Sequence, residues 1–362
     1  MNSARESFRY IPAAAALLCA FLLLSCSDGD MVTPPPAGPD TTSHDFVWDI
    51  TQIGVRHTAI RDIAAIAEDD VWLCGEIHFE DTYTYDSNGV YIQPYNLAHW
   101  DGKEWTFQRL KWQGDNPIAV KDIHAMKAFA SDDIWFFTGG DIAHWNGNSF
   151  ETQKVPLNIP EGSFLHLMDG YPGNLYLAGT RGAIMHFDCN KTFTRVLVPL
   201  LRDINDIHSS NGITMAVMNN WNIDEENDTY VLVIEGTKLH RLWREFKMYK
   251  GAKGIWFEDS SRIFIAGPGT GHYQNGEWGS LLSPDNKFLE AVSGTADNDV
   301  FVAGHFSSIQ HYNGKSWNIY EGHVPRGDIL FSELDNIPGH IYAIGVDHSG
   351  IFHFVHGRRV TQ

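Results

Sequence analysis

The sequence predicts an all-β protein, a seven-bladed β-propeller built from four-stranded antiparallel blades. Three observations lead to this prediction. A His-aromatic pair recurs along the chain, a strand-like segment that ends near glycine precedes most copies, and successive copies are spaced by 39 to 47 residues. Helical solenoids share this repeat length, but the units are rich in Val, Ile, Trp, Tyr and Gly and lack a sustained 3.6-residue apolar pattern.

The His-aromatic pair marks the third strand of each blade. It occurs six times, at His99-Trp100, His144-Trp145, His186-Phe187, His272-Tyr273, His311-Tyr312 and His353-Phe354. Val233-Ile234 takes its place in a seventh, degenerate copy. Asn-Gly or Asp-Gly follows several copies, as at 101–102 and 146–147, and such dipeptides form tight hairpins because both residues accept positive φ. A fourth strand opened by Trp or Phe then completes each unit.

The other strands precede this pair. Segments such as DDVWLCG at 69–75 and NDVFVAG at 298–304 predict second strands, and DIAAIA at 62–67 predicts a first strand. The segment FVWDITQIG at 46–54 resembles the outermost strands KEWTFQRL and KSWNIYEG. We therefore expect the propeller to span residues 46–362, with 46–54 closing the ring as the outer strand of the last blade.

The repeated histidine is expected to have a structural role. Six equivalent residues spread around a ring cannot converge on one substrate, and a histidine between blades needs a hydrogen-bond partner. Trp145 is expected to be core, as are the fourth-strand aromatics Trp105, Phe150, Trp278 and Trp317. Cys74 and Cys189 are expected to be free thiols, because a blade lies between them.

Residues 1–25 are typical of a lipoprotein signal peptide. Two arginines precede a short apolar run, and LLSC, ending at Cys26, resembles a bacterial lipobox, which implies lipidation of Cys26. An ordinary secretion signal with a chance cysteine is the alternative. Residues 26–45 contain three consecutive prolines and predict a flexible Pro-rich tether. We expect an exported protein held in the bacterial cell envelope through its lipid, at the outer membrane given Ser27.

The charge and motif inventory excludes several functions. The formal net charge of −19 argues against nucleic acid as a partner, because phosphate recognition needs clustered Lys and Arg. The sequence contains no GxSxG, HExxH or paired-cysteine metal motif. No cofactor is expected, apart from a weak indication of calcium described below.

The pattern D-[VI]-W-x-x-G followed by I-x-H-W-[DN]-G-x-x-W resembles bacterial exported propellers with Kelch-like, sialidase-like or sensor-type repeats. The resemblance covers 46–362 and implies the fold, because the matching residues are those that hold blades together. The Asp-box of sialidases, Ser-x-Asp-x-Gly-x-Thr-Trp, is absent.

Two insertions supply candidate ligand-binding residues. The first, at 76–96, carries His78, Tyr83, Tyr85, Tyr91 and Tyr95, whose amphipathic rings suit a carbohydrate or protein ligand. An extension packed on its neighbour is the alternative. The second, at 218–230, places a stacking aromatic between amide donors, in Asn220, Trp221 and Asn222. Its acids Asp224, Glu226 and Asp228 are weak calcium candidates, since the ordered loop spacing is missing, and a solvated acidic loop is the alternative.

Two functions remain open. The first is a non-catalytic binding module for a protein or glycan, which predicts an accessible aromatic patch and no clustered titratable groups in the channel. The second is a glycan-active hydrolase or lyase, which predicts several convergent titratable side chains at the channel mouth. The lack of catalytic motifs favours the binding module.

Overall fold

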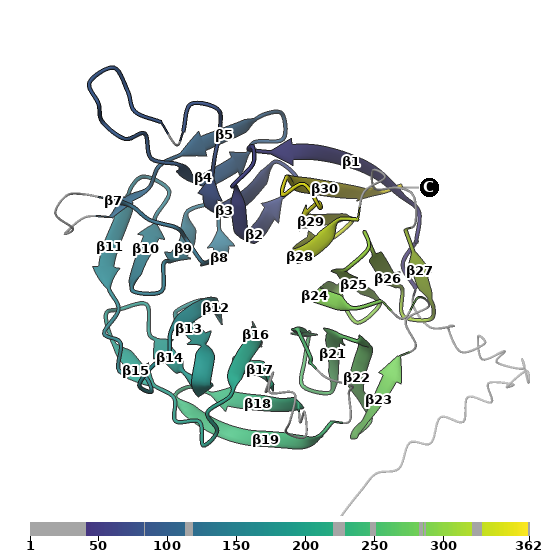
Figure 1. Cartoon of the computed structure of the whole chain (residues 1–362). Coiled ribbons are helices and arrows are strands. Elements are labelled where there is room, and N and C mark those ends of the chain that lie inside the picture. Colours follow the sequence, from purple (N-terminus) through teal and green to yellow (C-terminus); the bar gives the residue numbers. More distant parts are fainter. Residues whose placement is uncertain are drawn as a thin grey trace, which may run out of the picture. The chain divides into compact units, whose positions relative to one another are not determined.

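The computed structural model describes residues 41–82, 84–112, 119–219, 229–246, 251–281, 285, 287–320 and 328–360. Within these residues the secondary structure is β, apart from one 3-10 turn at Thr180–Gly182. Seven four-stranded antiparallel sheets form the blades of a ring, as predicted (Figure 1). Nowhere in the described part of the chain does a helix have the length and apolarity needed to cross a membrane.

The first four blades follow one another along the chain. Blade 1 contains β2 (Ala59–Ala67), β3 (Asp70–Ile77), β4 (Tyr95–Trp100) and β5 (Trp105–Gln108). Blade 2 contains β8 (Ala125–Ala130), β9 (Asp133–Phe137), β10 (Asp141–Trp145) and β11 (Phe150–Lys154). Blade 3 contains β12 (Leu165–Tyr171), β13 (Asn174–Gly179), β14 (Ile184–Phe187) and β15 (Phe193–Arg195). Blade 4 contains β16 (Asp203–Ser210), β17 (Ile213–Asn219), β18 (Thr229–Glu235) and β19 (Lys238–Phe246).

Three further blades complete the ring. Blade 5 contains β20 (Gly254–Phe257), β21 (Arg262–Gly267), β22 (Gly269–Gln274) and β23 (Glu277–Leu281). Blade 6 contains β24 (Leu289–Ala296), β25 (Asp299–Gly304), β26 (Ile309–Tyr312) and β27 (Trp317–Ile319). Blade 7 contains β28 (Leu330–Ile337), β29 (His340–Val346), β30 (Phe352–Arg359) and, from the other end of the chain, β1 (Phe46–Ile53). A small ladder of β6 (Lys111–Trp112) and β7 (Ala119–Val120) lies between blades 1 and 2.

The inner strands form a closed circle. Each packs beside the next in the order β2, β8, β12, β16, β20, β24 and β28, and β28 packs against β2. All seven inner strands begin on one face of the ring, which also carries the links between blades and the loops between second and third strands. We call it the mouth face. The opposite face carries the tight hairpin turns, and we call it the turn face.

The predicted closure by the N-terminal strand is confirmed. β1 pairs with β30 from Phe46 opposite Arg359 to Ile53 opposite Phe352. Residues before β1 lie on the turn face of blade 6, where Thr42 Oγ1 donates to the carbonyl oxygen of Asn298 at 2.6 Å and the Tyr320 hydroxyl donates to that of His44 at 2.9 Å. The chain therefore reaches the propeller on its turn face.

The core lies between blades and follows the two-residue period of the strands. In β9, Phe136 packs into the cluster shared with blade 1, whereas Phe137 packs into the cluster shared with blade 3. Both side chains are fully buried. Trp145, expected to be core, is only half-buried and packs at the edge of the first cluster. Cys74 is buried, Cys189 is partly exposed, and both are free thiols.

The structural role of the repeated histidine is confirmed in blades 1, 2, 3 and 6. His144 stacks on Trp135 at 4.1 Å between ring centroids, and its Nε2 lies 2.8 Å from Asp133 Oδ1. In blades 1, 3 and 6 the corresponding acid or amide partners are Asp70 for His99, Asn174 for His186 and Asp299 for His311.

Blade 7 corrects the sequence alignment. The repeated histidine pairs in register with the second-strand aromatic, as His144 does with Trp135. In blade 7 that aromatic is Tyr342 and its partner is His356, whereas the predicted His353 lies opposite Gly345. The error arose because the segment IFHFVHG contains two histidines three residues apart.

Candidate functional site

A cavity of about 420 Å³ occupies the central channel and is lined by residues of all seven blades. One polar side chain from each blade lines it where the inner strand begins: Arg61, His124, His166, Asn205, Lys253, Glu290 and Ser332. Five of these seven are the extra residue of a β-bulge in the inner strand. A bulge changes the direction of a side chain, and here bulges place a polar ring around the channel mouth.

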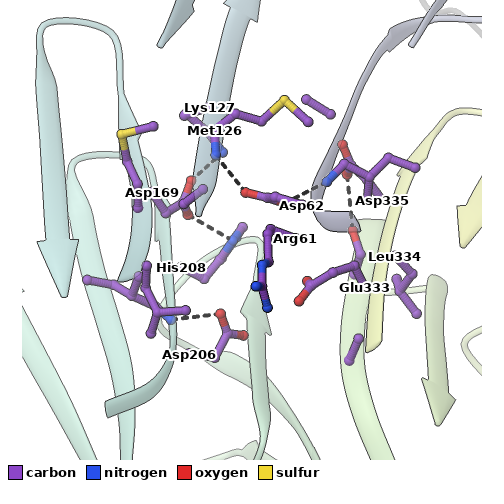
Figure 2. A pocket seen from close by; sticks show the side chains of 18 of the residues that line it. Arg61, Asp62, Met126, Lys127, Asp169, Asp206, His208, Glu333, Leu334 and Asp335 are labelled. Atoms are coloured by element: carbon purple, nitrogen blue, oxygen red, sulfur yellow. Dashed lines mark hydrogen bonds and ion pairs between the residues drawn. The ribbon is translucent and has the colours of Figure 1, made fainter. Parts of the chain in front are cut away.

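Three aspartates deeper in the channel join neighbouring blades. Asp62 accepts the backbone N–H of Ile63 at 2.7 Å and that of Met126, in the next blade, at 2.8 Å (Figure 2). Asp206 and Asp335 repeat this arrangement with the inner strands of the blades that follow them. Burial raises the pKa of Asp62 to about 7, although the two N–H donors oppose the change, and burial raises the pKa of Asp206 to a similar value.

Asp169 has charged partners instead. It forms an ion pair with Lys127, lies 3.3 Å from His208 Nδ1, and accepts the backbone N–H of Ser209. Burial alone would raise the pKa of Asp169, but Lys127 and His208 lower it to about 2. The Asp169 carboxylate is therefore ionised and neutralised in the channel wall.

The charged residues at the mouth are also paired. The Arg61 guanidinium donates to Asp122 Oδ2 from Nη2 at 3.0 Å and from Nε at 3.2 Å. Glu290 lies 3.4 Å from Lys253 Nζ and 2.9 Å from His305 Nε2. Arg61, Lys253 and Glu290, the charged side chains of the polar ring at the mouth, are therefore neutralised by ion pairs.

Glu333 differs from the other acids of the channel. It follows the bulge of β28 and faces the same cavity as Asp62 and Asp206 (Figure 2). Among the hydrogen bonds and ion pairs of the described residues, none involves its carboxyl group. Burial raises the pKa of Glu333 well above its usual range, and Asp62, Asp206 and Glu290 raise it further.

Most of the exposed apolar residues lie on the mouth face. Seven of the nine large apolar side chains that are exposed among the described residues lie in mouth-face loops: Tyr85, Val90, Leu157, Phe164, Leu197, Leu201 and Phe306. The other two, Val47 and Val360, lie at the outer edge of blade 7. We call Leu157, Phe164, Leu197, Leu201 and Phe306 the apolar rim. Exposed apolar side chains concentrated on one face make that face a candidate interaction surface.

Phe306 is presented by a strained turn. It follows His305 in the tight loop between β25 and β26, which is closed by the Ser308 N–H bonding the His305 carbonyl at 3.2 Å. Phe306 and Ser307 have φ of 58° and 57°, a region that bulky side chains avoid. The Ser307 N–H donates to the Ile329 carbonyl at 2.8 Å and holds this turn against the next blade, with Phe306 61% exposed.

The residues predicted in the first insertion do not form one patch. His78 is 1% exposed, and its ring nitrogens contact Thr82 Oγ1 at 2.9 Å and Glu76 Oε1 at 3.0 Å. Tyr85 and Tyr91 contact each other at the loop tip, with ring centroids 5.7 Å apart.

Tyr95 and the path of the loop show where the first insertion lies relative to the channel. Tyr95 packs under the Arg109 guanidinium, 3.8 Å from its ring centroid. Figure 1 shows the loop between β3 and β4 extending outward from the ring, away from the channel. The insertion therefore does not cover the cavity, and its exposed tip is a separate surface.

Several predicted residues lie outside the described part of the chain. They are Cys26, Tyr83, Asn220, Trp221, Asn222, Asp224, Glu226 and Asp228. Within residues that the structure does describe, no cluster of three or more His, Cys, Asp or Glu side chains could hold a metal ion.

Comparison with protein-family models and with curated proteins gave no match. Solved propellers do match the structure. YCF48 bound to D1 peptide is 16% identical with a TM-score of 0.62, and the match covers 90% of this chain and 100% of that one. YCF48 from Cyanidioschyzon merolae is 13% identical with a TM-score of 0.60, covering 85% and 98%. The WD40 propeller of Doa1 is 9% identical with a TM-score of 0.59, covering 84% and 95%. The chain therefore has the propeller fold of these proteins.

Proposed function

We propose that this protein is a non-catalytic binding module of the cell envelope, whose mouth face binds a protein partner. The observation that carries the proposal is the gathering of exposed apolar side chains on that face. Five of them, the apolar rim, lie on mouth-face loops in three parts of the ring. Protein interfaces combine such an apolar zone with polar groups that fix orientation, which the polar ring would supply.

The path of the chain supports this assignment. A lipid on Cys26 would be joined to the propeller through the Pro-rich tether, and the chain reaches the propeller on the turn face. An anchor attached there leaves the mouth face unobstructed for a partner. An outer-membrane location remains part of this proposal and follows from Ser27 after the lipobox.

A solved propeller supports a protein ligand over a carbohydrate. The structure of YCF48 has been solved bound to D1 peptide, so a propeller of this fold can bind a peptide. The apolar rim is rich in leucine, whereas sugar recognition relies on flat aromatic rings flanked by polar groups. We therefore assign the rim to a peptide segment with apolar side chains.

A glycan-active enzyme is the second candidate, because titratable side chains do converge in the channel. A glycosidase needs two carboxyl groups free to reach the sugar. Asp62, Asp206 and Asp335 each have both carboxylate oxygens bonded to backbone N–H groups, and Glu290 is held by Lys253 and His305. Because these four carboxyl groups are already bonded within the protein, the arrangement favours binding over catalysis.

The test uses the chain from residue 27 to 362, without lipid, as the target for a library of random peptides. A double variant, Leu201→Asp with Phe306→Asp, removes the rim, and Val360→Asp places the same charge on an exposed apolar residue away from it. We expect selected peptides whose affinity falls at least tenfold on the double variant and is unchanged on Val360→Asp.

A glycan array with and without calcium, run in parallel, separates the alternatives. Glycan binding without peptide binding would overturn the choice of a protein partner. Glycan turnover that Glu333→Gln abolishes would instead establish the enzyme. Peptide binding that survives the double variant would place the interface elsewhere.

A further inference from the structure

The channel cavity carries more acid than base. Its titratable lining consists of six carboxyl groups, three basic groups and three histidines, namely Asp62, Asp169, Asp206, Glu290, Glu333 and Asp335, then Arg61, Lys127 and Lys253, then His124, His166 and His208. The whole chain is also acidic, with a formal net charge of −19. A positively charged group entering the cavity would therefore be favoured by the local and the long-range field.

The three basic groups of the cavity are already engaged. Arg61 is held by Asp122 at the mouth, Lys127 by Asp169 and Lys253 by Glu290. Asp62, Asp206 and Asp335 each accept a backbone N–H group from the next blade, and we call them the staple aspartates. Glu333 is the acid left without such a partner among the described residues, and it lies within a cavity large enough for a side chain.

We infer that the channel binds a lysine or arginine side chain of the protein partner, whose positive group reaches Glu333 while neighbouring apolar residues of the partner cover the rim. This inference rests on the proposed function and names the chemistry of its ligand. A cation beside Glu333 neutralises a carboxylate that is otherwise costly to keep charged in this surrounding. The ligand is thus a segment with one basic residue flanked by apolar residues.

Proton release should accompany binding. Burial and the nearby Asp62, Asp206 and Glu290 raise the pKa of Glu333, which favours the protonated carboxyl group. Arg61 and Asp335, on the strands beside it, also face this cavity. A bound ammonium or guanidinium group favours the ionised carboxylate, so affinity should rise as the pH increases.

The experiment compares selected peptides that contain one Lys or Arg with the same peptides carrying norleucine at that position. We expect norleucine to weaken binding to the wild-type chain at least tenfold and to have little further effect on Glu333→Gln. Glu333→Gln keeps the size of the side chain, and thermal melting would verify that the variant is folded. The peptide substitution itself requires no change in the protein.

Three results would overturn the inference. If norleucine peptides bind as tightly as the basic ones, while the rim variant still abolishes binding, the interface is correct but the channel takes no cation. If the loss caused by norleucine is equally large on Glu333→Gln, the basic residue binds elsewhere. If the free amine agmatine binds in a Glu333-dependent manner and no peptide is selected, the occupant is a small amine and the proposed function is wrong as well.

Discussion

His340 Nδ1 lies 3.0 Å from His356 Nε2, at the position where other blades pair an acid or amide with the repeated histidine. The ring of His356 stacks on Tyr342 with 4.4 Å between centroids, as its counterparts stack on their second-strand aromatics. Blade 7 therefore keeps the stacking of the repeated histidine, but the partner of that histidine is an imidazole where other blades have a carboxylate or an amide.

This pair makes acid sensitivity a testable property of blade 7. Burial and the adjacent His340 lower the pKa of His356 to about 4, below its ordinary value of 6.5. The unfolded chain then binds more protons between these values, so stability falls as the pH decreases through this window. The loss at pH 5 from His356 alone should be roughly 1–2 kcal/mol.

His340→Asp should reduce that loss, because a carboxylate stabilises the charged imidazole. Urea denaturation at pH 5.0 and 7.5 measures the effect, with His348→Asn as an exposed histidine control. Equal losses of stability in the wild type and in His340→Asp would show that the pair does not carry this sensitivity.

The aspartate staples predict a large effect from a single channel residue. Asp206→Ala removes the partner of two backbone N–H groups, those of Ile207 and Ile255, and should cost about 2–4 kcal/mol. Asp101→Ala is the matched control, since Asp101 also accepts two backbone N–H groups but in an exposed hairpin turn. Denaturant unfolding measures the free energy of unfolding lost in each variant, and a much larger loss in Asp206→Ala would show that the staple aspartates hold the blades together. Similar small losses in the two variants would contradict this role.

Two tryptophans of blade 2 give a direct test of the core assignment. Trp135 is 7% exposed and packs between blades 2 and 3, so Trp135→Ala should cost about 3–5 kcal/mol. Trp145 is half-buried, and Trp145→Ala should cost roughly half as much. If Trp145→Ala proves the more damaging substitution in thermal melts, the assignment of these positions is wrong.

The fold could be predicted from sequence because each blade repeats the same local signals. The hairpin turns, the His-aromatic pairs and the similarity of 46–54 to other outer strands together define the blades and the closure of the ring. The alignment failed where two histidines compete, at His353 and His356. Spacing alone does not distinguish them, and only the pairing with Tyr342 does.

The channel could not be predicted in the same way. Its lining comes from seven strands that are distant in sequence, and the bulges that turn Arg61 or Glu290 toward the mouth leave no mark on an alternating pattern. Composition pointed instead to the insertion at 76–96, where His78 turns inward and the loop extends outward. Exposed apolar residues at scattered loop positions, such as Leu201 and Phe306, were the available signal for the mouth face.

Phe306 predicts an opposition between stability and binding. A type I′ turn favours Asn or Gly at the position that Phe306 occupies, because both tolerate positive φ. Phe306→Asn should therefore stabilise the propeller by up to about 1 kcal/mol, since it relieves backbone strain and removes an exposed ring. The same change should weaken peptide binding severalfold, because an exposed aromatic residue on a rigid turn is an effective anchor.

The matched control for Phe306 is Arg181→Asn, at the equivalent turn of blade 3, where φ is 56° and Gly182 follows. It relieves the same kind of strain without removing an apolar side chain. Both variants should raise the melting temperature, and only Phe306→Asn should reduce affinity for the selected peptides. A loss of stability in Phe306→Asn would mean that the ring packs on the propeller and supports the fold. If the Phe306 turn lowers stability and its side chain contributes only to binding, the residue has the stability–function trade-off expected of a functional surface.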